Sequence, residues 1–173
     1  PNSLSVSAHW SEQNNAYYIW QTATMYYRSV GVFAGLGKRM QWPDPYFTFY
    51  GELGYQHYGL KGWDSFILSD GNANTLSLKL VLQRSSVDAP FFSRSGSEFT
   101  LSVQATPPFS LWDGKNYADP ALSDQDRYRW IEFHKWQFKA QWFQALSSNG
   151  NLVLMAKAEM GYLGHYDKDK ISP

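Results

Sequence analysis

Leucine alternates with mostly polar residues throughout Leu76-Ser77-Leu78-Lys79-Leu80-Val81-Leu82-Gln83. Successive side chains of a β-strand point to opposite faces, so this stretch predicts a strand with one all-leucine face. The opposite face carries serine, lysine and glutamine, with Val81 as its one apolar member. Such a strand needs an apolar environment on one side and a polar one on the other.

The same period of two recurs in six further segments, and no segment has a convincing helical period. The chain is therefore predicted to be all-β, with seven strands. The other six predicted strands are Ser3–Trp10, Val30–Arg39, Phe47–Tyr58, Glu98–Ala105, Lys135–Trp142 and Leu152–Gly161.

Short and long connections alternate strictly between these predicted strands. The short ones are Gln41–Pro45, Ala89–Ser97 and Ser147–Asn151, and the long ones are Glu12–Ser29, Gly59–Ala73 and Pro107–Arg129. An antiparallel meander with short turns at one end and long loops at the other has this pattern. It is the layout of an outer-membrane β-barrel, although a soluble up-and-down sheet would share it.

Composition narrows the class of protein. The 173 residues are of single-domain length, and 15 basic and 15 acidic residues give zero net charge, which argues against a nucleic-acid binder. The absence of cysteine excludes disulfides and thiolate chemistry. No apolar run approaches the ~18 residues of a membrane-spanning helix. No signal segment opens the chain. Residues Pro1 to Ser7 already resemble the start of a strand, so we expect the chain to be part of a longer protein.

Aromatic residues make up 18% of the chain and gather near the ends of the predicted strands. Amphipathic rings in this position form the girdles of membrane barrels at the two interfaces, which favours a membrane barrel over the core of a β-sandwich. The residues concerned are Trp10, Tyr46, Phe47, Tyr55, Tyr58, Trp136, Trp142, Phe143, Tyr162 and Tyr166.

Candidate metal ligands do not form a convincing site. Glu132 and His134 are two residues apart on one predicted strand face, but no third ligand has a matching spacing. The acidic loop lacks the order of a calcium-binding loop, so we interpret it as solvated. Its acidic residues are Asp113, Asp119, Asp124 and Asp126.

Nothing in the sequence indicates an enzyme. Ser95-Gly96-Ser97 is better explained as a turn than as a nucleophile elbow. Acid or base catalysis by a carboxyl group needs an apolar pocket, which a wet barrel lumen does not offer. The glutamates that such a mechanism would use, Glu52, Glu98, Glu132 and Glu159, lie on predicted polar faces. No cofactor or metal is expected.

Several segments resemble the barrel of the Omp85 family of outer-membrane proteins, in particular the BamA type of Bacteroidetes-type bacteria. They are residues 35–47, residues 94–108 and the aromatic run Tyr128–Phe143. Phe92-Ser93-Arg94-Ser95-Gly96 is similar to the F-P-x-x-G turn of that family, with Ser93 in place of the proline. The resemblance covers essentially the whole chain.

The resemblance implies the middle part of a sixteen-stranded transmembrane barrel, with residues 1–173 belonging to one barrel domain. POTRA domains, the remaining strands, the lateral gate and the V-R-G-[FY] motif of the sixth loop would lie outside this sequence. It implies the central subunit of the machine that folds and inserts β-barrel proteins into the outer membrane of a Gram-negative bacterium. The implied partners are the lipid bilayer, accessory lipoproteins, unfolded outer-membrane clients and periplasmic chaperones.

The two faces of the predicted strands receive separate assignments. Lipid-facing positions are Leu76, Leu78, Leu80, Leu82, Phe99, Leu101 and Val103. Lumen-facing positions are Lys79, Gln83, Gln104, Lys135, Lys139, Lys157 and Glu159. The periplasmic turn motif comprises Phe92, Arg94, Ser95 and Gly96. Two alternatives stay open: a porin or other outer-membrane channel, and a soluble β-sandwich binding module.

Overall fold

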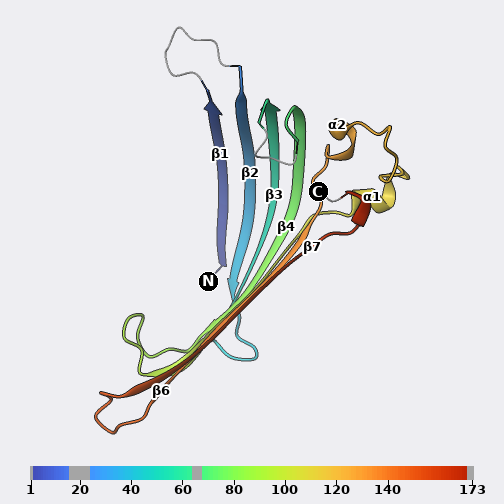
Figure 1. Cartoon of the computed structure of the whole chain (residues 1–173). Helices are drawn as coiled ribbons and strands as arrows, with labels where there is room; N and C mark the ends of the chain where they lie inside the picture. Colours follow the sequence, from blue (N-terminus) through green and yellow to red (C-terminus); the bar gives the residue numbers. More distant parts are fainter. Residues whose placement is uncertain (1, 16–23, 64–67, 171–173) are drawn as a thin grey trace.

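The computed structural model describes residues 2–15, 24–63 and 68–170, and in this part of the chain seven antiparallel strands form one sheet. Each strand pairs with the next in sequence, so β1 and β7 are the two edges (Figure 1). The strands are β1 Asn2–Asn14, β2 Tyr26–Arg39, β3 Phe47–Lys61, β4 Gly71–Ser85, β5 Ser95–Ala105, β6 His134–Ala145 and β7 Val153–Gly164. The predicted all-β meander is confirmed.

The described helices are single turns in the connections, a small correction to the expectation of no helix. They are α1 Phe109–Trp112, α2 Asp124–Arg127 and the 3-10 turn η1 Lys168–Lys170. Ser123 caps α2, because its Oγ accepts a hydrogen bond from the Asp126 amide. Within the described ranges, no helix is long and apolar enough to cross a membrane.

Two of the long loops are shorter than predicted, because the strands continue past the alternating residues. In the first hairpin Glu12 still pairs with Arg28, and Gln13 with Tyr27. Strand β3 continues to Lys61, and β4 begins at Gly71. The predicted loops Glu12–Ser29 and Gly59–Ala73 therefore reduce to residues 15–25 and 62–70, of which 16–23 and 64–67 lie outside the described residues.

The described residues form a single sheet with no second layer packed on it, so the β-sandwich alternative is wrong. Across the described residues no large side chain is fully buried, and apolar strand residues are widely exposed. Val6 and Met160 are each 70% exposed, and Leu36 is 65% exposed. A face of this kind in water would favour aggregation, so it requires an apolar surrounding.

The third long loop covers the upper edge of β4, where β5 no longer pairs with it. Asn74 donates from its backbone N–H to the Arg129 carbonyl and accepts from the Ile131 N–H. Gln125 in α2 extends this pairing, since its side-chain amide both accepts from the Asn72 N–H (2.7 Å) and donates to the Asn72 carbonyl (2.7 Å). Backbone groups that would otherwise be unpaired are thereby satisfied.

We expect that these 173 residues, expressed alone, do not form a stable monomeric barrel. With seven strands in the described meander, β1 and β7 run in the same direction, whereas bacterial single-chain barrels close antiparallel pairs with even strand numbers. Two open edges in a detergent micelle leave N–H and C=O groups without partners. Aggregation or oligomerisation by size-exclusion chromatography is the expected result, and a heat-modifiable monomer would contradict it.

Candidate functional site: a two-faced sheet with polar clusters at both ends

One face of the sheet is apolar, because the register places apolar positions of neighbouring strands opposite one another. Leu53 pairs with Leu78, and Leu80 pairs with Val103, which pairs with Trp136. The residues predicted to face lipid all lie on this apolar face: Leu76, Leu78, Leu80, Leu82, Phe99, Leu101 and Val103. Their common face agrees with the predicted alternation, while their contact with lipid stays a prediction.

The other face is polar, and here the register aligns one continuous row across four strands. Glu52 pairs with Lys79, Lys79 with Gln104, and Gln104 with Lys135. The residues predicted to face the lumen all share this polar face: Lys79, Gln83, Gln104, Lys135, Lys139, Lys157 and Glu159. Whether this face lines a lumen stays a prediction.

Carboxylates on the polar face are already engaged by neighbouring side chains. Glu98 accepts hydrogen bonds from Gln83 (3.2 Å) and Gln141 (2.7 Å). The Lys157 ammonium lies 3.0 Å from Glu159. Such paired, solvated groups are suited to filling a wet interior rather than to acid or base catalysis.

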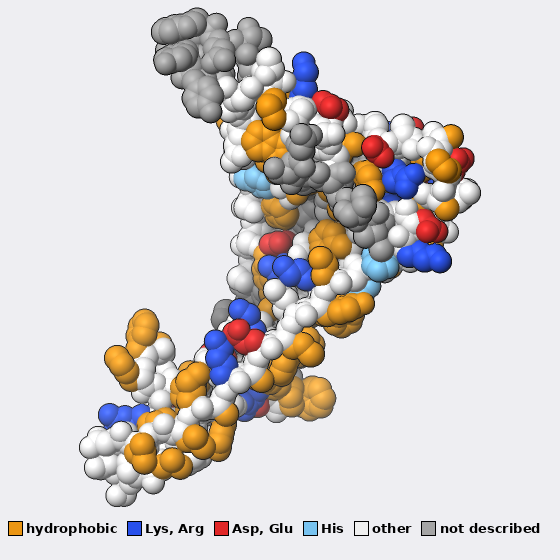
Figure 2. Space-filling model, in the orientation of Figure 1, with side chains coloured by type: hydrophobic (Ala, Val, Ile, Leu, Met, Phe, Trp, Pro, Cys, Tyr) orange, Lys and Arg blue, Asp and Glu red, His pale blue; other side chains and the backbone are white. Residues whose placement is uncertain are grey.

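The extent of the apolar face along the barrel axis matches the apolar band of outer-membrane barrels. On β2 it is bounded by Arg28 and Lys38, and on β4 by Asn74 and Arg84. Each interval of ten residues measures ~33 Å along the strand, or ~25 Å along the barrel axis at a tilt of ~40°. This matches the apolar band of outer-membrane barrels. Figure 2 shows hydrophobic side chains along one side of the lower wall and charged ones on the other.

The structure agrees only in part with the predicted aromatic girdle. Trp10, Trp136 and Trp142 lie on the apolar face, as an interfacial belt requires. Tyr58 and Phe143, in contrast, lie on the polar face, because an even number of positions separates Tyr58 from Glu52 on β3 and Phe143 from Lys139 on β6. Position near a strand end does not reveal the face, which follows from the alternation of side chains along the strand.

A buried ion pair fastens the third long loop at the long-loop end of the sheet. The Lys170 ammonium lies 2.6 Å from Glu132, and the two side chains are only 6% and 3% exposed. Glu132 also accepts hydrogen bonds from the amide and the hydroxyl of Ser110 (2.7 and 2.6 Å). The ammonium lies 4.7 Å from the centre of the Tyr117 ring. The carboxylate and ammonium are thus well compensated.

The candidate metal residues have other partners. Glu132 belongs to this ion pair, whereas His134 accepts a hydrogen bond from the Trp136 indole (3.1 Å). Asp113 accepts a hydrogen bond from the Tyr117 hydroxyl. The pKa of Tyr117 is raised, chiefly by burial and next by this hydrogen bond. In the part of the chain that the structure covers, no three His, Cys, Asp or Glu residues are grouped to hold a metal ion.

The predicted turn motif is divided between the loop that joins β4 to β5 and the start of β5. Phe92 and Arg94 lie in the loop, whereas Ser95 and Gly96, which were predicted to belong to the turn, are the first two residues of β5 and pair with Gln144 and Phe143. Gly96 has φ +103°, and an added Cβ would lie 2.3 Å from the Ser86 carbonyl oxygen, so this position requires glycine. Asp88 orders the loop by accepting from the amides of Arg94 (2.9 Å) and Ser95 (3.3 Å), and these bonds hold its pKa below the usual range. Phe92 is 96% exposed.

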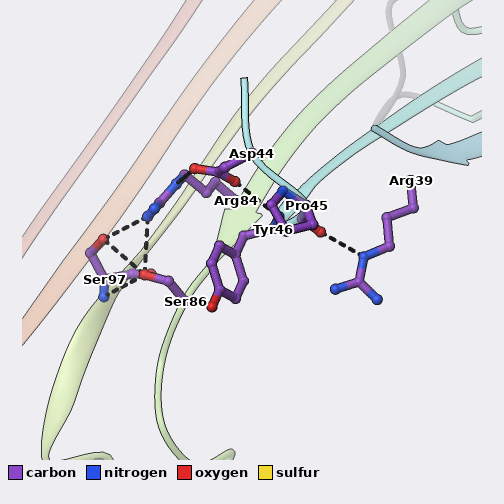
Figure 3. Close-up of polar contacts among 7 residues, drawn as sticks. All are labelled: Arg39, Asp44, Pro45, Tyr46, Arg84, Ser86 and Ser97. Carbon is purple, nitrogen blue, oxygen red and sulfur yellow. Dashed lines mark hydrogen bonds and ion pairs between the residues drawn. The ribbon is translucent and has the colours of Figure 1, made fainter. Parts of the chain in front are cut away.

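A second cluster lies at the short-turn end, on the apolar face (Figure 3). The Arg84 Nε donates to Asp44 (2.9 Å), and Nη1 donates to the hydroxyls of Ser86 (3.0 Å) and Ser97 (3.1 Å). Asp44 also accepts from the Tyr46 amide (2.9 Å). The two ends of the apolar face thus resemble each other, since Arg28 and Glu12 pair at the opposite end (3.0 Å).

Sequence reasoning missed the Arg84–Asp44 and Glu132–Lys170 pairs. Arg84 could have been noticed in the sequence, because it lies two residues after Leu82, where the alternation predicts another apolar residue. No sequence feature indicates the partner of Lys170, because Glu132 is 38 residues away and only the fold brings the two side chains together.

A meander of seven described strands with one apolar and one polar face is the wall of a transmembrane antiparallel β-barrel. A family model described as the Omp85 superfamily domain matches residues 1–173, and the chain belongs to this superfamily. It is thus an outer-membrane β-barrel protein of the Omp85 type.

Among solved structures, the fold is similar to the crystal structure of BamA from Haemophilus ducreyi lacking POTRA domains 1–3. The TM-score is 0.63 and the sequence identity 16%. The similarity covers 95% of this chain and 30% of that one, so the chain spans about a third of its length. No curated protein matches.

The two faces can be distinguished by cysteine labelling in intact membranes. We expect Leu78→Cys, in the full-length protein, to react with a lipid-soluble maleimide and Lys79→Cys with a water-soluble one, because neighbouring residues point to opposite faces. The chain has no native cysteine within these residues to interfere. A lipid-soluble reagent that labels position 79 but not 78 would reverse the assignment.

The topology predicts which connections face the outside of the cell. In barrels of this class long loops are extracellular and short turns periplasmic. We therefore expect protease added to intact cells to cleave the third long loop, residues 106–133, which carries exposed Lys115. The turn at Asn149 and Gly150 should stay protected until the outer membrane is permeabilised, and an epitope there that is accessible on intact cells would mean the inverse topology.

Proposed function

We propose that the chain forms part of the barrel wall of the central subunit of an outer-membrane protein assembly machine. That subunit would fold and insert β-barrel proteins into the outer membrane of a Gram-negative bacterium. The observation that carries the proposal is the Omp85 superfamily match over residues 1–173. The two-faced sheet and the similarity in fold to a BamA barrel support it.

The proposed activity requires no catalytic residue. Incoming strands of a client would pair with an open barrel edge, and burial of the apolar band of the client in lipid would supply the free energy. The seven strands described here would act as a scaffold for that edge. Proposed partners are accessory lipoproteins, unfolded clients and periplasmic chaperones, with POTRA domains elsewhere in the same protein.

Reconstitution tests this proposal. Liposomes containing the full-length protein should accelerate the folding of a urea-denatured β-barrel client relative to empty liposomes and to liposomes with an unrelated barrel. Heat-modifiable migration of the client on gels measures folding. No acceleration, together with stable single-channel conductance in planar bilayers, would contradict an assembly role and favour the channel alternative.

A further inference from the structure

The Arg84 cluster stands at the border of the apolar face. Arg84 pairs with Phe47 on one side and Phe99 on the other, and it follows Leu82 in the alternation. A charged residue on the lipid face of a barrel costs ~2–4 kcal/mol at the bilayer midplane and little near the interface. If the apolar face contacts lipid as proposed, Arg84 therefore lies at the level of the phospholipid headgroups.

Neighbouring side chains fix the guanidinium without covering it. Nε and Nη1 are occupied by Asp44, Ser86 and Ser97, whereas Nη2 donates no hydrogen bond to any described residue. The side chains of Arg84 and Asp44 are 23% and 31% exposed. Both charges can thus be reached by a ligand from outside, and their relative position is set by the fold.

Opposite charges side by side define the type of ligand. The Arg84–Asp44 pair has no net charge, so it offers no general attraction for an anionic headgroup. It suits a headgroup with two charges, whose phosphate would accept from Nη2 and whose ammonium would donate to Asp44. Desolvation raises the pKa of Asp44, but the hydrogen bonds and charge of Arg84 and the Tyr46 amide outweigh it, so the carboxylate stays ionised.

Aromatic rings complete the cluster. The guanidinium lies 5.6 Å from the centre of the Tyr46 ring and 5.8 Å from that of Phe47. In the same turn, Trp42 is 80% and Tyr46 48% exposed. Exposed amphipathic rings are typical of the headgroup level of a membrane. They could contact the glycerol region of a lipid whose acyl chains lie along the apolar face.

We propose that Arg84 and Asp44 form a binding site for a zwitterionic phospholipid with a primary ammonium group, of the phosphatidylethanolamine type. This inference rests on the proposed orientation of the apolar face toward lipid. A choline headgroup has no N–H to donate to Asp44, and a glycerol headgroup has no cation. The site should therefore distinguish three phospholipids of equal acyl composition.

Native mass spectrometry of the full-length protein in detergent tests the site. With equal amounts of phosphatidylethanolamine, phosphatidylcholine and phosphatidylglycerol, the ethanolamine lipid should be retained about tenfold more than either of the others. Asp44→Asn can still accept from Nε but leaves Arg84 uncompensated, so it should shift the preference to phosphatidylglycerol. Arg84→Gln should reduce retention of the ethanolamine lipid about tenfold.

The matched control is Glu159→Gln, which makes the same change in charge on the polar face and should leave the lipid preference as it is. Asp44→Glu keeps the carboxylate and should keep the ethanolamine preference. It provides a second test of the site if heat-modifiable migration shows that Asp44→Asn does not fold. Equal retention of the three lipids by the unaltered protein, or an unchanged preference in both Asp44→Asn and Arg84→Gln, overturns the proposal. Either result with client folding intact overturns this inference alone and leaves the assembly role standing.

Discussion

Leu80→Arg, made in the full-length protein, should destabilise the folded barrel by about 2–4 kcal/mol. Leu80 lies within the apolar face, where it pairs with Gly51 on one side and Val103 on the other. A guanidinium there would enter the hydrocarbon region of the bilayer, far from either polar end of the face. Urea titration of folding into liposomes, followed by tryptophan fluorescence, measures the loss.

The control for this substitution is Leu152→Arg. Leu152 lies in the short turn between β6 and β7 and is 59% exposed, so the new charge would lie near the interface and cost about 0–1 kcal/mol. Equal losses for the two variants would show that Leu80 does not face the bilayer interior. The prediction concerns the environment of one face and does not depend on the assembly role.

Removing one member of the buried ion pair should release the third long loop. Glu132→Gln leaves the Lys170 ammonium buried without its counter-ion, which in comparable buried pairs costs about 3–5 kcal/mol. Because the pair links this loop to the segment after β7, the loss should appear as local opening rather than as collapse of the strands. Hydrogen exchange over residues 107–133 and cleavage by added protease measure it.

Two further variants separate charge burial from a general effect of substitution. Lys168→Gln removes an exposed charge from the same 3-10 turn and should leave exchange in the loop unchanged. In the double variant Glu132→Gln with Lys170→Met no charge stays buried, so much of the protection should return. Unaltered protection in Glu132→Gln alone would contradict a fastening role for the pair.

Alternation along the chain was sufficient for most of the architecture. Leucine at every second position from Leu76 to Leu82 predicted both the strand and its two faces, because side-chain direction in a strand follows from backbone geometry alone. The strict change between short and long connections predicted the antiparallel meander. Neither inference requires knowledge of which residues meet across the sheet.

Strand ends were less predictable for a physical reason. Near Glu12 and Tyr27 the ladder continues although the apolar pattern has stopped. Alternation records where one face meets an apolar environment, whereas backbone pairing extends as far as two chains stay in register. The predicted loops were therefore too long by the residues that project beyond the apolar band.

The sequence by itself determined the all-β class, the seven strands and the face on which each strand residue lies, because these depend on local periodicity. Only the tertiary structure decided which polar groups meet. Arg84 binds Asp44, which is 40 residues away in the sequence, and Lys170 binds Glu132, which is 38 residues away. Strand register and loop packing bring these pairs together. Contacts of this kind depend on distance in space, and one sequence read along its length carries no record of that distance.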